Sequence, residues 1–183
     1  MKRNNSAHLL AVDSIYEALV QLMEKKTYQE ISITDITNRA GVSRMAYYRN
    51  YKDKDSILLN RLQKKLENES DFISLKKNNA NDDVWIDRLQ AIQKDPVMKH
   101  IIHAGLIEQS FELHLAFIMK LYKQAYSVDT LDQDTLLLIY QRLGSLFGIM
   151  FYVMKENAHP DAKLLIRHLQ SIPLYTTKKS THK

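Results

Sequence analysis

Cysteine is absent from this chain of 183 residues. Its absence excludes disulfides, thiolate metal sites and cysteine nucleophiles, and a reducing cytoplasm is the simplest location for such a protein. Residues that break secondary structure are scarce, since there are only four glycines and three prolines. Apolar residues recur at spacings of three and four, and no alternating run is long enough for a strand. We therefore predict an all-α protein.

The patterns expected of an enzyme are also missing. The sequence has no glycine-rich phosphate loop, no Ser-His-Asp pattern and no second cluster of carboxylates. His100 and His103 lie three residues apart, with Glu108 near, and this spacing could bind a metal, but such pairs arise often by chance. We expect no catalysis, no cofactor and no metal.

Two segments bear on contact with membranes. The polar residues 1–8 lead into an amphipathic segment, so we expect no signal peptide. The longest apolar stretch, residues 136–154, contains Gln141 and Arg142 and is predicted to be a buried helix rather than a membrane span. We expect no contact with a membrane.

Positive charge is concentrated in one short segment. The whole chain has a formal net charge of +5, and residues 39–54 hold five basic residues against one acid, Asp53. Such a density suits the phosphates of a nucleic acid or another anionic surface.

The same part of the chain predicts a helix-turn-helix. Ser32 and Asp35 fit a capping box that starts a short helix reaching about Ala40. Gly41 stands where a chain leaving a helix commonly needs a positive φ angle, and Ser43 can cap a third helix that extends to about residue 50. Two helices joined by a three-residue turn can lay the second helix in the major groove of DNA.

Helical periodicity continues on both sides of this unit. A fourth helix is expected to open near Asp53 and to carry apolar residues through Leu66. Residues 27–30 break the pattern, and the polar residues 68–83 are expected to form a loop or a frayed helix end. The remaining helices are expected at residues 6–25, 83–93, 96–103, 105–126, 132–157 and 160–172.

The run from Ile31 to Leu58, ISITDITNRAGVSRMAYYRNYKDKDSIL, resembles the DNA-binding domain of the TetR family of bacterial regulators. In that family a Thr or Ser precedes the second helix, an Ala-Gly-Val-Ser turn leads into the recognition helix, and a Tyr-x-His-Phe-x-x-Lys signature closes it. This chain reads Tyr48-Arg49-Asn50-Tyr51-Lys52-Asp53-Lys54, with Asn50 in place of the histidine. The resemblance covers about the first 60 residues.

The resemblance implies roles for single residues. Arg44 would lie against the bases and could bind a guanine through two hydrogen bonds, whereas Lys54 would hold the DNA backbone. Tyr47 has two interpretations, contact with DNA or the favoured one, burial beneath the recognition helix, and Tyr51 is expected in the core. The predicted DNA-binding residues are Ser32, Thr34, Ser43, Arg44, Met45, Ala46, Tyr47, Tyr48, Asn50 and Lys54.

The last helices predict contact between subunits. By resemblance to the family, the final two helices of each subunit would form a four-helix dimer interface; alternatively, both complete the core of the monomer. Gly144 and Gly148, four apart on a helix, leave a shallow strip that a second helix can approach. The residues expected at the interface are Leu143, Phe147, Met150, Phe151, Leu165 and Leu169.

The middle helices offer candidates for an effector pocket. The family usually binds a small molecule there, and an apolar effector would shift the fourth helix. The same residues are more often plain core, and a protein partner or no effector at all are the alternatives. The residues considered for ligand contact are Trp85, Phe111, His114, Phe117 and Tyr122.

The sequence therefore predicts a DNA-binding domain at residues 1–54, a helical regulatory and dimerisation domain at 55–175 and a disordered basic tail at 176–183. The resemblance implies a regulator of transcription, by family habit a repressor, that binds double-stranded DNA at a palindromic operator as a homodimer. The alternative is a DNA-binding protein with an architectural or cell-division role and no small-molecule effector.

Overall fold

Helices make up the regular structure of the computed structural model, which describes residues 2–68, 96–156, 161, 164 and 167. Within these residues there is no strand, and the predicted all-α class is confirmed.

The amino-terminal part combines one long helix with two short ones. The long helix α1 (Lys2–Met23) packs against α2 (Ile33–Ala40), and α2 contacts α3 (Arg44–Tyr48). Ile15 and Leu19 are fully buried on the inner face of α1. A short 3-10 turn, η1 (Tyr28–Glu30), lies between α1 and α2.

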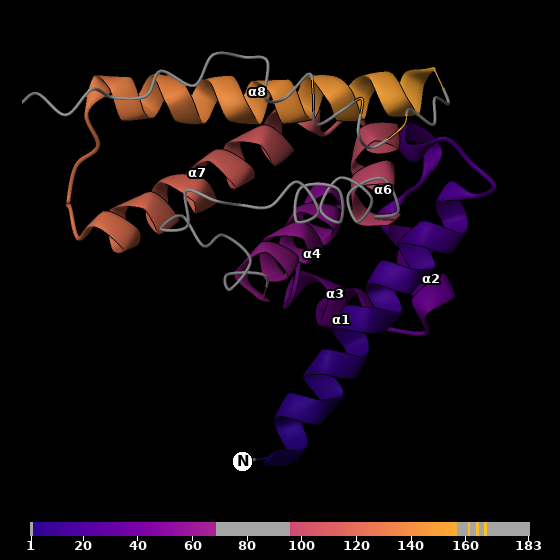
Figure 1. Cartoon of the computed structure of the whole chain (residues 1–183). Helices are drawn as coiled ribbons and strands as arrows, with labels where there is room; N and C mark the ends of the chain where they lie inside the picture. The colour runs from indigo at the N-terminus through magenta and orange to yellow at the C-terminus, as the bar shows by residue number, and fades with distance from the viewer. Residues whose placement is uncertain (1, 69–95, 157–160, 162–163, 165–166, 168–183) are drawn as a thin grey trace, which may run out of the picture.

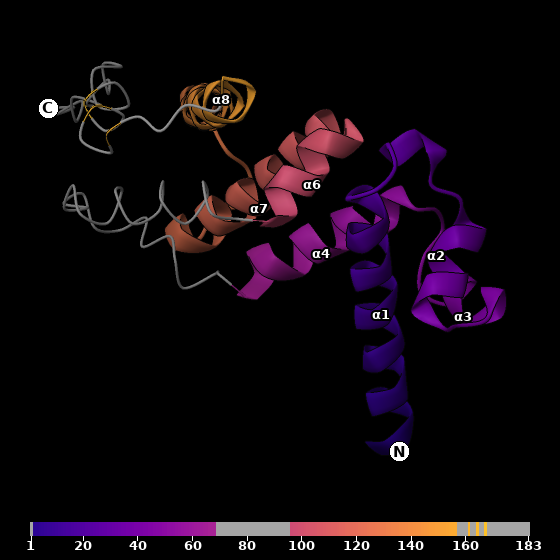
Figure 2. The ribbon, with the colours of Figure 1, turned by 90° about the vertical axis from the view of Figure 1, so that its right-hand side faces the viewer.

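A central helix, α4 (Asp55–Asn68), connects this unit to the rest of the chain. It packs against α6 (Pro96–Ala104) and α7 (Ile107–Tyr126), and α7 in turn packs against α8 (Gln133–Lys155). In both ribbon views α8 lies at one end of the molecule and α3 lies toward the other, with α4 between them (Figures 1 and 2).

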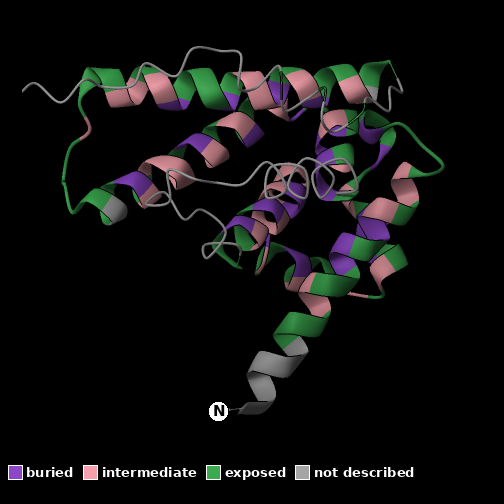
Figure 3. Cartoon of the chain, in the orientation of Figure 1, coloured by how far each residue is buried: buried purple, intermediate pink, exposed green. Residues whose placement is uncertain are grey.

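The buried side chains form a continuous core that runs from α1 through α4 to α8. In α4 the buried residues are Ile57, Leu58, Leu62 and Leu66, a helical spacing that places them on one face. Purple, buried segments accordingly follow the inner faces of the helices in Figure 3.

Most predicted helices are present, with shifted ends. The first helix begins at Lys2 rather than residue 6, and residues 27–30, where the pattern breaks, contain η1. The third helix ends at Tyr48 rather than near residue 50. The loop expected at 68–83 lies almost entirely outside the described residues, as do the helix at 83–93 and the tail, and of the helix at 160–172 only three residues are described.

The burial of α8 differs from the prediction. This helix is long and apolar enough to cross a membrane by length and composition alone, yet only 28% of its apolar stretch Gln133–Val153 is buried in the chain. The expectation of a buried helix is therefore correct for one face, because α7 covers only that face.

Candidate nucleic-acid interface

The turn between α2 and α3 is fixed by the backbone of Gly41. This residue has φ 66° and ψ 28°, the left-handed conformation that glycine adopts without a steric penalty. The backbone N–H of Val42 then donates to the carbonyl of Thr37 at 3.1 Å. The Ser43 hydroxyl accepts a hydrogen bond from the N–H of Ala46 at 3.1 Å, which caps α3 as predicted.

The start of α2 is closed by the predicted capping box. The Ser32 hydroxyl accepts from the N–H of Asp35 at 3.1 Å, and the Asp35 carboxylate accepts from the N–H of Ser32 at 2.9 Å. The N–H and hydroxyl of Ser32 hold the pKa of Asp35 below its ordinary value, and Lys26 lies 3.5 Å from the same carboxylate. Both helices of the motif thus begin at well-defined residues.

One face of α3 is open to solvent. Met45 and Tyr48 are 68% and 57% exposed, and Ser43 and Arg44 are exposed beside them. Ala46 is half-buried. No acidic residue occurs between Ser43 and Lys52, so this face presents cations, hydroxyl groups and apolar surface, a combination suited to phosphates and base edges.

Arg44 and Thr34 are in contact across the turn. The Nη2 atom of Arg44 donates a hydrogen bond to the Oγ1 atom of Thr34 at 2.7 Å, and both side chains are exposed. The first residue of α3 is therefore linked to the first turn of α2. The sequence did not predict this contact, although it placed both residues at the DNA surface.

Tyr47 and Tyr51 point into the core. Tyr47 is 0% exposed, and its ring contacts those of Tyr48 and Tyr51 at centroid distances of 5.2 and 6.0 Å. Burial raises the pKa of both phenols, that of Tyr51 to about 12. The core interpretation of both tyrosines is confirmed, and the Tyr47 side chain is not accessible to DNA in this structure.

Asn50 closes the end of α3. Its side-chain amide donates to the carbonyl of Ala46 at 2.7 Å, while its backbone N–H donates to the carbonyl of Tyr47 at 2.9 Å. In a continuing α-helix the backbone N–H of residue 50 would take the Ala46 carbonyl. The side chain occupies that position instead, which explains why α3 is shorter than predicted. One of the two donors of the amide expected to bind a phosphate is thus engaged within the helix.

Lys54 contacts the turn before α2. Its ammonium donates to the carbonyls of Tyr28 at 2.6 Å and Ile31 at 3.0 Å, and it lies 4.5 Å from the centre of the Tyr28 ring. The Tyr28 hydroxyl donates to Asp55 at 2.6 Å, and burial together with this carboxylate raises the pKa of the phenol. Lys54 therefore holds η1 and the start of α2 against the start of α4.

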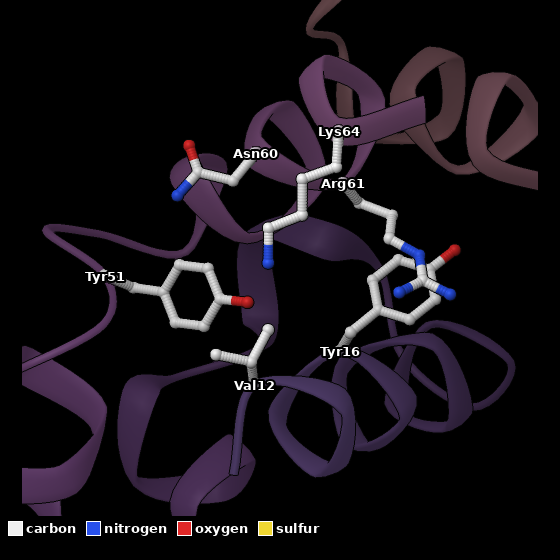
Figure 4. Close-up of a pocket in the computed structure, with 6 residues that line it drawn as sticks. All are labelled: Val12, Tyr16, Tyr51, Asn60, Arg61 and Lys64. Atoms are coloured by element: carbon white, nitrogen blue, oxygen red, sulfur yellow. The ribbon is translucent and has the colours of Figure 1, made fainter. Parts of the chain in front are cut away.

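A small hollow between α1 and α4 is packed rather than open. It encloses about 10 Å³, room for one water at most. Arg61 lies over the ring of Tyr16 at 4.8 Å and donates to Asp13 at 3.0 Å, as Figure 4 shows for the ring contact. The hollow is lined by Val12, Tyr16, Tyr51, Asn60, Arg61 and Lys64. Its size excludes a small-molecule effector at this point.

Two of the residues considered for effector binding, Phe111 and His114, lie on α7 and pack against α8. The rings of Phe111 and His114 each lie 5.2 Å from that of Phe147 on α8. Tyr122 is buried and stacks on Tyr126 at 5.9 Å, and Phe117 is half-buried. Trp85 lies outside the described residues.

The predicted dimer residues divide into two groups. Leu143, Phe147 and Met150 are buried within the chain at 1%, 9% and 7% exposure, so in this structure they contribute to the core of the monomer, the alternative that the sequence left open. The reason is that α8 has apolar residues on two faces and α7 covers the face that carries these three. Phe151 is exposed, and Leu165 and Leu169 lie outside the described residues.

Among the described residues, the histidines of α6 belong to no group of three potential metal ligands. His103 and Glu108 are exposed and His100 is half-buried. Over residues 2–68 and 96–156, no group of three potential ligands is close enough to hold a metal ion.

Comparison with known proteins gives matches at two levels. Residues 15–60 match the family model of bacterial regulatory proteins of the tetR family. The whole fold is similar to the fatty acid degradation regulator FadR from Bacillus halodurans, with a TM-score of 0.58, 17% sequence identity and coverage of 92% of this chain and 96% of that chain. A candidate transcriptional regulator from Pseudomonas aeruginosa PAO1 matches with a TM-score of 0.46, 15% identity and coverage of 92% and 88%. No curated protein matches the sequence.

Proposed function

Because residues 15–60 match the family model of bacterial regulatory proteins of the tetR family, we propose that the chain is a DNA-binding regulator of transcription that reads a palindromic operator as a homodimer and represses the promoter it occupies. The reading element is α3 and the contact between subunits is made by α8.

The observation that carries this proposal is the open face of α3. Caps at Ser32 and Ser43 fix both helices of the motif, and Gly41 sets the angle between them. Arg44 stands at the exposed leading end of α3, and in the described chain no carboxylate pairs with it. A guanidinium in this position keeps its full charge and most of its donors for a guanine edge or a phosphate.

Support for the dimer comes from the outer face of α8. Helical spacing places Leu137, Tyr140, Gly144, Gly148 and Phe151 on one face, and all of them are exposed. No atom lies within 4 Å of a Cβ built on either glycine, so a second helix could approach closely there. A two-fold pair of chains joined through this outer face would present two copies of α3 to one duplex.

An effector belongs to the same proposal in a limited form. A small apolar molecule that entered between α7 and α8 would have to separate the ring of Phe147 from those of Phe111 and His114. Such a separation would be transmitted to α4, because α4 packs directly on α7. Thermal shift against a panel of apolar compounds tests this part alone, and the absence of any stabilising compound would count against it.

The experiment that tests the proposed function is selection of bound duplexes from a random pool. Wild-type protein should select a near-palindrome, and Arg44→Ala should lose preference at one position in each half, a discrimination of about 1–3 kcal/mol. Arg39→Ala is the matched control, because Arg39 is an exposed arginine in the last turn of α2 rather than at the start of α3. Protein that ignores every duplex at low salt would exclude the proposal.

A further inference from the structure

The contact between Thr34 and Arg44 joins two parts of the predicted DNA-binding surface, one expected to bind a phosphate and the other expected to bind a base. Thr34 lies in the first turn of α2, and Arg44 is the first residue of α3. Their hydrogen bond, at 2.7 Å, spans ten positions of the sequence and crosses the turn of the motif. Arg44 is thereby held by a neutral hydroxyl, which leaves the charge of the guanidinium uncompensated.

We propose that Thr34 is a positioning residue for base recognition. Its hydroxyl accepts a hydrogen bond from Arg44 and at the same time donates a hydrogen bond to a DNA phosphate. This inference rests on the proposed function. A threonine hydroxyl has one proton and two lone pairs, so accepting from Arg44 does not use its donor. Guanidinium has five N–H donors, and one bond to Thr34 leaves four for the bases.

The consequence is that the backbone contact sets the register of the base contact. Phosphate contacts position a protein on the duplex, and base contacts specify the sequence. A free arginine side chain samples many rotamers and loses this freedom when it binds. The hydrogen bond to Thr34 already restricts the Arg44 side chain before DNA binds, so less conformational entropy is lost on binding. Immobilising one such side chain corresponds to about a 2- to 10-fold effect on affinity.

The surroundings of the pair support a role in binding rather than in folding. Both side chains are exposed, and Ser32 and Asp35 already cap α2 without help from Thr34. Arg39 offers a matched comparison, because its Nε donates to the side-chain carbonyl of Gln21 on α1 at 2.7 Å. That contact has the same length and exposure but lies away from the leading end of α3.

The test compares Thr34→Val, Thr34→Ser and Gln21→Ala in the duplex selection, each with and without Arg44→Ala. Thr34→Val should reduce discrimination by about 2- to 10-fold at the position that Arg44→Ala abolishes, and it should have no further effect on preference in the Arg44→Ala background. Thr34→Ser should restore wild-type preference, and Gln21→Ala should leave preference unchanged. Circular dichroism should show the same helix content in all variants.

A second measurement uses the protein without DNA. The ¹⁵N relaxation of the Arg44 Nε should report a more mobile side chain in Thr34→Val than in wild type or Thr34→Ser. Unchanged base preference in Thr34→Val, or unchanged Arg44 mobility, would overturn the inference while leaving the proposed function intact. A wild-type protein that selects no duplex would instead exclude the proposed function, and the inference with it.

Discussion

At the scale of single residues, Lys54 shows how a surface cation can serve the fold. The resemblance to the TetR family placed it on the DNA backbone, whereas its ammonium donates to the carbonyls of Tyr28 and Ile31. These carbonyls lie just before α2, and neither belongs to a long helix whose backbone N–H groups could bond to it. Lys54 therefore positions the start of α2 from within the protein, and contact of the same ammonium with a phosphate stays a prediction.

Replacement of Lys54 by methionine should lower the free energy of unfolding by about 1–3 kcal/mol, because the Ile31 carbonyl loses a charged donor. Urea denaturation measures the change. Lys52→Met is the control, since Lys52 is exposed two residues earlier and should leave stability unchanged within about 0.5 kcal/mol. Equal stabilities of the two variants would show that the carbonyl contacts contribute nothing to folding.

The sequence could not reveal these residue contacts, and the reason is distance along the chain. The partners of Lys54 lie 23 and 26 positions away, and Thr34 lies ten positions from Arg44. No local pattern marks such pairs. The partner of Asn50, the carbonyl of Ala46, is only four positions away. This contact was nevertheless not predicted, because the resemblance to the family implied that Asn50 binds a phosphate.

At the scale of elements, both ends of α2 and the start of α3 agree with the prediction from the sequence. The capping box at Ser32 and Asp35, the positive φ at Gly41 and the cap at Ser43 are all present. Each depends on residues within three positions of one another, so local chemistry decides them. The 3-10 turn η1 was not predicted, because residues 27–30 indicated only a break in the helical pattern. Thr27 and Glu30 nevertheless form a capping box of their own, a signal that the sequence also contained.

These caps predict how stability depends on pH. Hydrogen bonds from Ser32 hold the pKa of Asp35 below its ordinary value, those from Thr27 do the same for Glu30, and those from Thr135 for Asp132. A carboxylate with a lowered folded pKa stabilises the fold above its unfolded pKa, near pH 4, and this contribution is lost as the pH falls through the folded pKa. We expect the free energy of unfolding to decrease below about pH 4.

The variant that checks this dependence is Asp35→Asn. It should be less stable than wild type at pH 7 and should lose less stability between pH 7 and pH 3 in urea denaturation. Glu17→Gln removes an exposed carboxylate of α1 away from any cap and should follow the wild-type curve. Parallel curves for Asp35→Asn and wild type would contradict the role of the cap.

At the scale of the whole molecule, α8 has two different faces. Leu143, Phe147 and Met150 pack toward α7, while Leu137, Phe151 and the two glycines face away from it. Composition alone could not show which face of α8 is buried and which is exposed, because both faces are apolar. The sequence predicts only that apolar residues cover a large part of the helix surface. The position of α7 decides which face is buried in the chain.

A side chain at Gly144 should separate folding from assembly. Gly144→Gln meets no atom within 4 Å of its Cβ in the chain, and loss of a glycine from an exposed helix should stabilise it by up to about 1 kcal/mol. In a dimer joined through the outer face of α8, the same side chain would force the two helices apart. Sedimentation velocity should therefore show a shift toward monomer, with weaker binding to the selected operator.

The control for this variant is Arg142→Gln, which changes an exposed residue of α8 off the outer face. It should leave the oligomeric state unchanged. A wild-type protein that sediments as a monomer at micromolar concentration, or a Gly144→Gln dimer of undiminished affinity, would contradict assembly through the outer face of α8.

The shortness of α3 has a consequence for any genome in which the protein acts. Five residues of helix measure about 7.5 Å, the rise of about two base pairs. Two specified base pairs recur by chance about once in every 16 positions, among about 10⁶ or more competing sites. Under the proposed function, a solitary copy would therefore have too little information to find one promoter, and the rarity of a true target would come from the number of copies that bind together and from their fixed separation.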